Sequence, residues 1–309
     1  MKKSNGFQIV FILFASILLS YCTGSTEKNS RIDNANMKSS SGQELELPQR
    51  RIVYQIPEME NVVCHKGEIY YSVDSMDLEA DIYTPPGLSR GSKLPVVILT
   101  NNYPDVAWKK RSGVVHKDWQ MIISWAELIA ASGMVAVTYQ TKYSPSEADS
   151  LISYLSRNAD KFNIDINRIS LFGCSANALA AQSLMQNDNY NIRCVVLYYG
   201  ALLTPDQKYF EELNSVTNEY GFYLSDLKQV DDIPSDIPIL VTRAGKDKYP
   251  LILMTIDHFL NEAVKSNAKI TFINYPEGQH DFDVLDDTKT SKSIIIQTID
   301  FLITNLDVK

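Results

Sequence analysis

The sequence predicts an α/β fold with a mostly parallel central sheet, antiparallel N-terminal strands and helices on both faces. Early segments such as "EIYYSV" (68–73) alternate apolar and polar residues, which is typical of half-buried antiparallel strands. Later segments such as "LPVVILT" (94–100) are apolar throughout and alternate with helical patterns. Strands of that kind lie in parallel sheets that helices cover on both faces.

The individual elements follow from the same two patterns. Half-buried strands are predicted at "RIVYQI" (51–56), "EIYYSV" and "LEADIYTP" (78–85), and the turn residues "PPG" end this part. Ser144 is predicted to cap a helix that begins at Pro145. The buried strands are predicted at 94–100, 134–140, 168–173, 194–200, 237–245 and 269–276, and the helices at 118–132, 144–162, from 176 onward, 250–266 and 288–305.

The N-terminus has the pattern of an export signal. Positive charge in "MKK" precedes the apolar run "GFQIVFILFASILLSYC" (6–22), which is typical of a secretory signal peptide over 1–21. The ending "LLSYC" resembles a bacterial lipobox, although Tyr21 stands where a small residue is usual, and this resemblance implies a lipid anchor on Cys22. The alternative is an uncleaved membrane anchor. Both interpretations predict an exported protein in the cell envelope, tethered to a bacterial membrane.

The rest of the chain divides into a tether and one domain. Residues 22–48 are polar with almost no large apolar side chains, so they predict a flexible tether. The folded domain is predicted over 49–309. Within it, 201–234 interrupts the alternation of strands and helices, is rich in Tyr and Phe, and follows the end of a strand. Because ligands of open α/β sheets bind at those ends, this insertion is interpreted as a partial lid; a surface excursion is the alternative.

Charge and cysteine spacing exclude several classes of function. The net charge is −8 and the lysines and arginines form no basic stripe, so nucleic acid is not an expected partner. Cys64, Cys174 and Cys194 fit no zinc pattern, and the four histidines do not cluster with them. We therefore expect no metal and, without a dinucleotide fingerprint or a P-loop, no cofactor. The spacing leaves open whether Cys64 and Cys194 form a disulfide.

The stretch "GCSAN" (173–177) lies between a predicted strand and a predicted helix. A serine at such a turn is typical of the nucleophile elbow G-x-S-x-G, so Ser175 is the candidate nucleophile, with a helix-capping role as the alternative. Gly173 permits the tight turn, whereas Asn177 replaces the second glycine of the motif. Cys174 is a rival nucleophile, but it lies outside the central position of the motif and is expected to pack in the core.

Two candidate partners of this serine follow buried strands later in the chain. Asp247 comes after the strand at 237–245 and is preferred as the acid over Asp257, which falls inside a predicted helix. His280, in "HDF", lies on a loop after the last predicted strand and is the candidate base.

In the placement and order of serine, aspartate and histidine, residues 50–306 resemble the α/β-hydrolase fold. Within it they are similar to the dienelactone-hydrolase-like and small esterase branch. The resemblance implies a carboxylic-ester hydrolase that forms an acyl-enzyme on Ser175, with Asp247 orienting His280. It also implies an oxyanion hole built from two backbone amides. One would come from Ala176, and the other from Asn102 or Tyr103 in "NNYPD" (101–105), where a His-Gly pair is usual.

The expected substrate is a small-molecule ester, and other functions stay open. A peptidase or an acyltransferase can use the same fold and the same three residues. A catalytically inactive envelope lipoprotein that only binds ligands is the other alternative. The departures at Asn177 and at Asn101-Asn102 are the observations that favour it.

Overall fold

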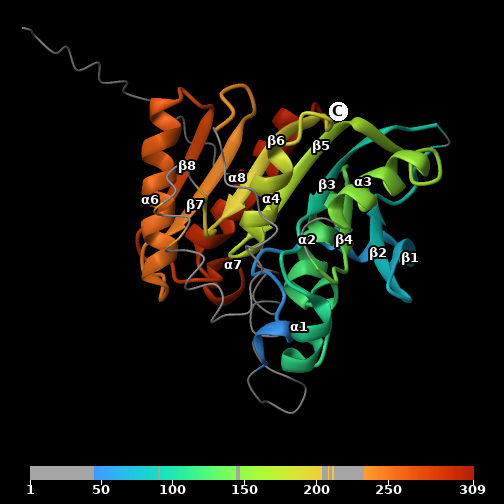
Figure 1. The fold of residues 1–309 in the computed structure, drawn as a ribbon, viewed down its shortest axis with the longest axis horizontal. Helices are drawn as coiled ribbons and strands as arrows, with labels where there is room; N and C mark the ends of the chain where they lie inside the picture. The colour runs from blue at the N-terminus through green and yellow to red at the C-terminus, as the bar shows by residue number, and fades with distance from the viewer. Residues whose placement is uncertain (1–44, 90, 144–146, 204–207, 209–210, 212–232) are drawn as a thin grey trace, which may run out of the picture.

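The computed structural model describes residues 45–89, 91–143, 147–203, 208, 211 and 233–309 (Figure 1). The predicted signal peptide, Cys22, most of the tether, the Ser144 cap and most of the 201–234 insertion lie outside the described residues. Within those ranges, no helix has the length and apolar character needed to cross a bilayer.

Eight strands form one sheet in the order β1-β2-β4-β3-β5-β6-β7-β8. β1 pairs antiparallel with β2 and β2 with β4, while all other pairs are parallel, so the predicted mixed sheet is confirmed. The strands are β1 (Val63–Val73), β2 (Met76–Thr84), β3 (Leu94–Leu99), β4 (Val135–Tyr139), β5 (Ile164–Cys174), β6 (Ile192–Tyr198), β7 (Ile239–Ala244) and β8 (Ile270–Tyr275).

The strand order reverses direction next to β3, because the chain places β4 on one side of β3 and β5 on the other. Open α/β sheets bind ligands at such switch points, outside the carboxyl ends of the strands. The loops that follow β3 and β5 are therefore neighbours at this edge of the sheet. α1 and α7 lie at the same edge (Figure 1).

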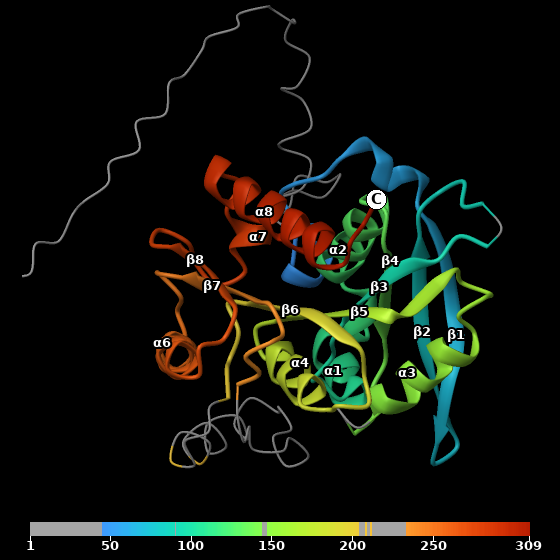
Figure 2. The ribbon, with the colours of Figure 1, turned by 90° about the horizontal axis from the view of Figure 1, so that it is seen from above.

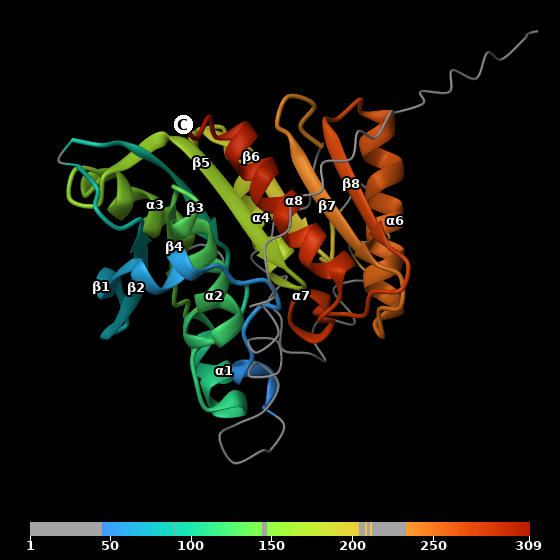
Figure 3. The ribbon, with the colours of Figure 1, turned by 180° about the vertical axis from the view of Figure 1, so that it is seen from behind.

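Helices cover both faces of the sheet, and each face has its own apolar core. α3, α4 and α6 pack on one face, and α2 and α8 on the other (Figure 2). Seen from behind, α8 crosses the middle of the sheet, and α7 lies at its start (Figure 3). The helices are α1 (Asp105–Ser112), α2 (Gln120–Ala131), α3 (Glu147–Arg157), α4 (Asn177–Met185), α6 (Pro250–Lys265), α7 (Phe282–Leu285) and α8 (Lys289–Asn305), with 3-10 turns η1 (Leu47–Gln49), η2 (Pro57–Asn61) and η3 (His116–Asp118).

The predicted strand at 51–56 is wrong. This segment lies across α2 instead of joining the sheet: the Ile52 amide donates to Ser124 Oγ at 3.0 Å, and Arg51 pairs with Glu127. Ile52 is fully buried there. The apolar residues of the segment therefore bury themselves against a helix, a contact that an alternating pattern alone does not distinguish from sheet pairing.

Candidate active site

The turn between β5 and α4 consists of only two residues, Ser175 and Ala176. Ser175 has a φ of 53°, in the left-handed region that a residue with a side chain seldom adopts. Two backbone hydrogen bonds hold Ser175 in this conformation. Its amide donates to the Tyr198 carbonyl at 2.9 Å, and its carbonyl accepts from the Ala201 amide at 3.1 Å. Strained backbone of this kind persists where the surrounding structure enforces it, and it is concentrated at functional sites.

Gly173 and Gly200 allow α4 to pack closely against the sheet, because a side chain at either position would collide with α4. A Cβ on Gly173 would lie 2.6 Å from the Asn177 carbonyl oxygen, and a Cβ on Gly200 would lie 2.3 Å from the Ala178 Cβ. Both distances are too short for non-bonded atoms. Gly200 follows β6, so the close packing expected from the second glycine of the motif comes from another strand.

Ser175, Asp247 and His280, which follow β5, β7 and β8, lie within hydrogen-bond distance of one another in sequence from serine to histidine to aspartate. Ser175 Oγ lies 2.9 Å from His280 Nε2, and His280 Nδ1 lies 2.6 Å from Asp247 Oδ2. His280 is 5 % exposed and Asp247 7 % exposed. Because the carboxylate can only accept, Nδ1 carries the proton, which leaves Nε2 as the acceptor for the serine hydroxyl.

Backbone contacts between two loops fix the Asp247–His280 distance. The Gly245 amide donates to the Tyr275 carbonyl and the Lys246 amide to the Gly278 carbonyl, both at 2.8 Å. Asp247 Oδ1 in turn accepts from the Tyr249 amide at 2.9 Å. The loops after β7 and β8 therefore form one unit that holds the acid and the base.

Asp283, which the sequence pattern does not single out, holds the loop that carries His280 against α2 and the end of β6. It is fully buried and accepts from Trp125 Nε1 at 2.7 Å and from the Tyr199 hydroxyl at 2.6 Å. Burial raises the pKa of its carboxyl to about 6, and the two hydrogen bonds oppose this. The second aspartate of "HDFDV" is Asp283, and its presence there is the only sequence signal for this contact. The sequence does not reveal that Trp125 of α2 is its partner.

Several charged groups surround His280. Burial and the charge of Lys248 lower the pKa of His280. The hydrogen bond to Asp247 and the charges of Asp281 and Asp247 raise it by more, so the pKa lies above its ordinary value. Asp281 Oδ1 lies 3.9 Å from Nε2. The rings of Tyr199 and Tyr249 contact the imidazole edge-on, with ring centroids 5.0 Å and 4.9 Å away.

Asp281→Asn is expected to move the acidic limb of the kcat/KM pH profile to lower pH. The imidazole must be neutral to accept a proton, so activity is lost as pH falls through the His280 pKa. Removing the Asp281 charge removes one cause that raises this pKa. The measurement is the pH dependence of turnover of an ester whose leaving group absorbs at all pH values used. An acidic limb that stays in place, or moves upward, would contradict this electrostatic account.

Cys174, the rival nucleophile, is buried in the apolar core on the face that α2 and α8 cover. Burial raises the pKa of its thiol well above the usual value, and the charges of Asp283 and Asp281 add to this. A thiol that remains protonated is a poor nucleophile. Cys64, Cys174 and Cys194 are all free, so Cys64 and Cys194 form no disulfide. Among the residues described here, no three His, Cys, Asp or Glu side chains converge as a metal site requires.

The loop after β3 differs from the expected oxyanion arrangement. The Asn102 amide donates to Asn177 Oδ1 and the Tyr103 amide to Asn101 Oδ1, each at 2.8 Å. Both amides proposed as donors to an oxyanion therefore already have side-chain acceptors. The Ala176 amide is the other expected donor, and it immediately precedes α4, whose first amides have no acceptor within the helix.

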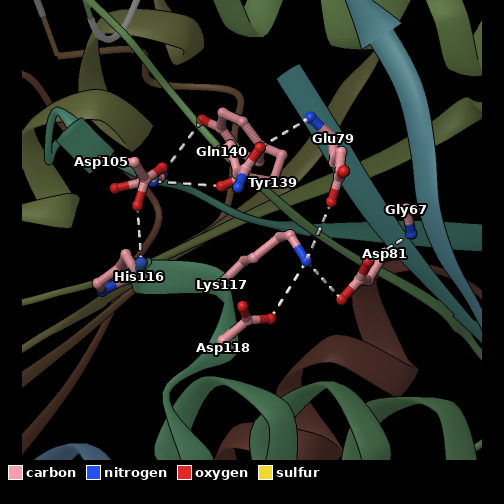
Figure 4. A network of polar contacts seen from close by, with 10 residues as sticks. Gly67, Glu79, Asp81, Asp105, His116, Lys117, Asp118, Tyr139 and Gln140 are labelled. Atoms are coloured by element: carbon pink, nitrogen blue, oxygen red, sulfur yellow. Dashed lines mark hydrogen bonds and ion pairs between the residues drawn. The ribbon is translucent and has the colours of Figure 1, made fainter. Parts of the chain in front are cut away.

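Asp105 is the centre of the network that holds this loop (Figure 4). It is fully buried and accepts from the amides of His116 and Thr141, both at 2.7 Å, and from Asn101 Nδ2 at 3.1 Å. Burial raises its pKa to about 6, and these hydrogen bonds oppose the rise. Next to it, Lys117 pairs with Asp81 at 3.0 Å (Figure 4).

Comparison with known proteins identifies the fold. No protein-family model and no curated protein sequence matches the chain. Among solved structures, esterase B of Lactobacillus rhamnosis is similar with a TM-score of 0.58 at 16 % identity, covering 82 % of this chain and 90 % of that one. Esterase 2 of Thermogutta terrifontis matches with a TM-score of 0.57 at 17 % identity over 80 % and 94 % of the two chains. Vibralactone cyclase matches with a TM-score of 0.59 at 13 % identity over 81 % and 82 %.

The esterase B structure is of an inhibited form, and other structures of the T. terrifontis esterase are propionate-bound, butyrate-bound or phosphoramylated by tabun. Together with the sheet order and the two helical layers, these matches show that the chain has the α/β-hydrolase fold. At this level of identity they establish the fold, whereas function depends on the chemistry of the site.

Proposed function

We propose that the protein is a serine hydrolase that cleaves small carboxylic esters through an acyl-enzyme on Ser175. The observation that carries this proposal is the continuous hydrogen-bonded chain from Ser175 through His280 to Asp247, with the serine on a strained turn. A nucleophile bonded to a base that a third group orients is the signature of activated covalent catalysis. We further propose that the protein belongs to the dienelactone-hydrolase-like branch. The export-signal pattern of residues 1–22 supports a location in the cell envelope.

Acylation begins when Ser175 Oγ attacks the carbonyl carbon of the ester. As the Oγ–C bond forms, the hydroxyl proton passes to His280 Nε2 and the carbonyl π electrons move onto oxygen, which becomes an oxyanion. The oxyanion then re-forms the carbonyl and expels the alkoxide, which takes the proton from Nε2. Asp247 keeps its charge throughout and stabilises the imidazolium.

Deacylation repeats these steps with water. His280 Nε2 accepts a proton from water while the water oxygen bonds to the acyl carbon. Collapse of the second oxyanion breaks the Oγ–C bond, Oγ recovers the proton, and the carboxylic acid leaves. The two proton transfers therefore balance: the Ser175 proton leaves with the alcohol through His280 Nε2, and a water proton restores the Ser175 hydroxyl through the same nitrogen.

A substrate panel tests this proposal. We expect turnover of p-nitrophenyl esters with short acyl chains, with little activity on matched p-nitroanilides and with water preferred over added alcohol acceptors. The short chain is suggested by the propionate and butyrate bound to the T. terrifontis esterase. Faster cleavage of anilides would favour a peptidase and preferred transfer to alcohols an acyltransferase. A complete lack of turnover would favour the ligand-binding alternative.

A further inference from the structure

Asp281 places a second carboxylate beside the imidazole of His280. Its Oδ1 atom lies 3.9 Å from His280 Nε2, the nitrogen that also contacts Ser175 Oγ at 2.9 Å. The backbone carbonyl of Asp281 accepts from the amides of Val284 and Leu285, both at 2.9 Å, and its φ is 59°. The main chain therefore fixes this residue where its carboxylate faces the reacting atoms before any substrate binds.

The carboxylate of Asp281 lacks the hydrogen bonds that buried acids usually have. The side chain is only 12 % exposed, and although it precedes α7 at the N-cap position, it accepts no capping hydrogen bond. Within the part of the chain that the structure describes, no group donates a hydrogen bond to it, and His280 is its one neighbour at ion-pair distance. Asp247 and Asp283, which are also buried, each accept two hydrogen bonds. Because burying a charge without such partners is costly, we expect Asp281 to find its partner in the bound substrate.

The contact with Nε2 identifies the part of an ester that Asp281 faces. During acylation Nε2 returns its proton to the oxygen of the departing alcohol, so that oxygen lies against Nε2. Groups attached to the alcohol are therefore close to the carboxylate. A carboxylate at this place attracts a cationic hydrogen-bond donor and repels an anion.

We propose that Asp281 selects esters whose alcohol portion carries a protonated amine a few bonds from the ester oxygen. This assignment rests on the proposed function, because it presumes that His280 protonates a departing alcohol. The amine pairs with the carboxylate and supplies the hydrogen bond that Asp281 lacks. An anionic group at the same place adds a further negative charge to a site that already holds Asp247 and Asp281, so esters of that kind are disfavoured.

Lys248, on the loop after β7, carries the opposite charge. This lysine is exposed, its ammonium lies over the Tyr249 ring at 5.1 Å, and it forms no ion pair with Asp281 in the described part of the chain. Burial raises the pKa of Asp281, the charges of His280 and Lys248 lower it, and the charge of Asp247 adds to the rise. A substrate amine in direct contact has the stronger effect, because the attraction between charges weakens with distance and in water.

Two esters of equal size test the proposal: dimethylaminoethyl propionate, which is protonated at neutral pH, and isopentyl propionate, its neutral isostere. We expect the wild-type kcat/KM to favour the cationic ester by about 10–100-fold, measured as acid release in a pH-stat. In Asp281→Asn this preference should fall by about tenfold or more, because the amide keeps the shape and loses the charge. Asparagine also tolerates the left-handed backbone of this position.

The ratio between the two esters is the decisive quantity. It does not depend on the fraction of folded protein, and a loss of imidazolium stabilisation in Asp281→Asn lowers both rates together. Asp257→Asn is the matched control, since it removes the same charge from an exposed side chain that pairs with Arg243. Its ester preference should equal that of the wild type.

Three results would overturn the Asp281 proposal. The first is a preference that stays within about threefold of wild type in Asp281→Asn, and the second is an equal loss in Asp257→Asn. The third needs no variant: a wild type that favours the cationic ester no more than alkaline hydrolysis does. In each case the hydrolase proposal stands if Ser175→Ala has lost turnover of both esters, whereas full activity of Ser175→Ala would overturn both proposals.

Discussion

Ser175→Ala is expected to lower kcat for a short-chain aryl ester by about 10⁶, leaving only a rate close to the background of the folded protein. The loss is this large because the hydroxyl that forms the covalent bond is removed and His280 Nε2, 2.9 Å away, has no proton to accept from the enzyme. KM is expected to change little, since the serine contributes mainly to the transition state. The measurement is steady-state turnover at an enzyme concentration high enough to detect the residual rate.

Cys174→Ala is the control for this change. It alters the adjacent residue, whose side chain is buried and packs in the core, so turnover per folded site should remain within about threefold of wild type. Ester turnover that persists in Ser175→Ala and disappears in Cys174→Ala would show that the cysteine is the nucleophile.

Asp247→Asn is expected to lower kcat by about 10⁴. The carboxylate oxygen 2.6 Å from His280 Nδ1 fixes the proton on that nitrogen. An amide can instead donate to Nδ1, which favours the opposite tautomer and leaves Nε2 unable to accept the serine proton. The fold should be retained because the change is isosteric, and a thermal unfolding curve checks this.

Asp257→Asn provides the matched comparison. Asp257 lies in α6, is exposed and pairs with Arg243 at 2.7 Å. We expect its loss to leave kcat unchanged. Equal effects of the two substitutions, or a small effect at position 247, would remove Asp247 from the relay.

The sequence predicted the elements that depend on local pattern. Buried strands show as apolar runs, and the strand ends locate Ser175, Asp247 and His280 because parallel strands deliver their carboxyl ends to one edge. The helices predicted at 118–132, 250–266 and 288–305 begin and end within two residues of α2, α6 and α8, whereas the helix predicted over 144–162 ends five residues beyond the end of α3.

The parts that sequence did not predict are determined by contacts between distant segments. Residues 51–56 bury apolar side chains against α2, which the same alternating pattern cannot distinguish from a strand. The amides of Asn102 and Tyr103 are occupied by side chains of the loop itself and of α4. Likewise, the need for Gly200 depends on its distance from Ala178, which only the folded chain defines.

The most direct test of the relay is the site of fluorophosphonate labelling, identified by peptide mass mapping of the wild-type protein. We expect one modification per molecule, on the peptide containing Ser175. Labelling should be strongly slowed in His280→Ala, because the base no longer takes the hydroxyl proton. A label found on another residue, or an unlabelled Ser175 in the folded wild-type protein, would contradict it.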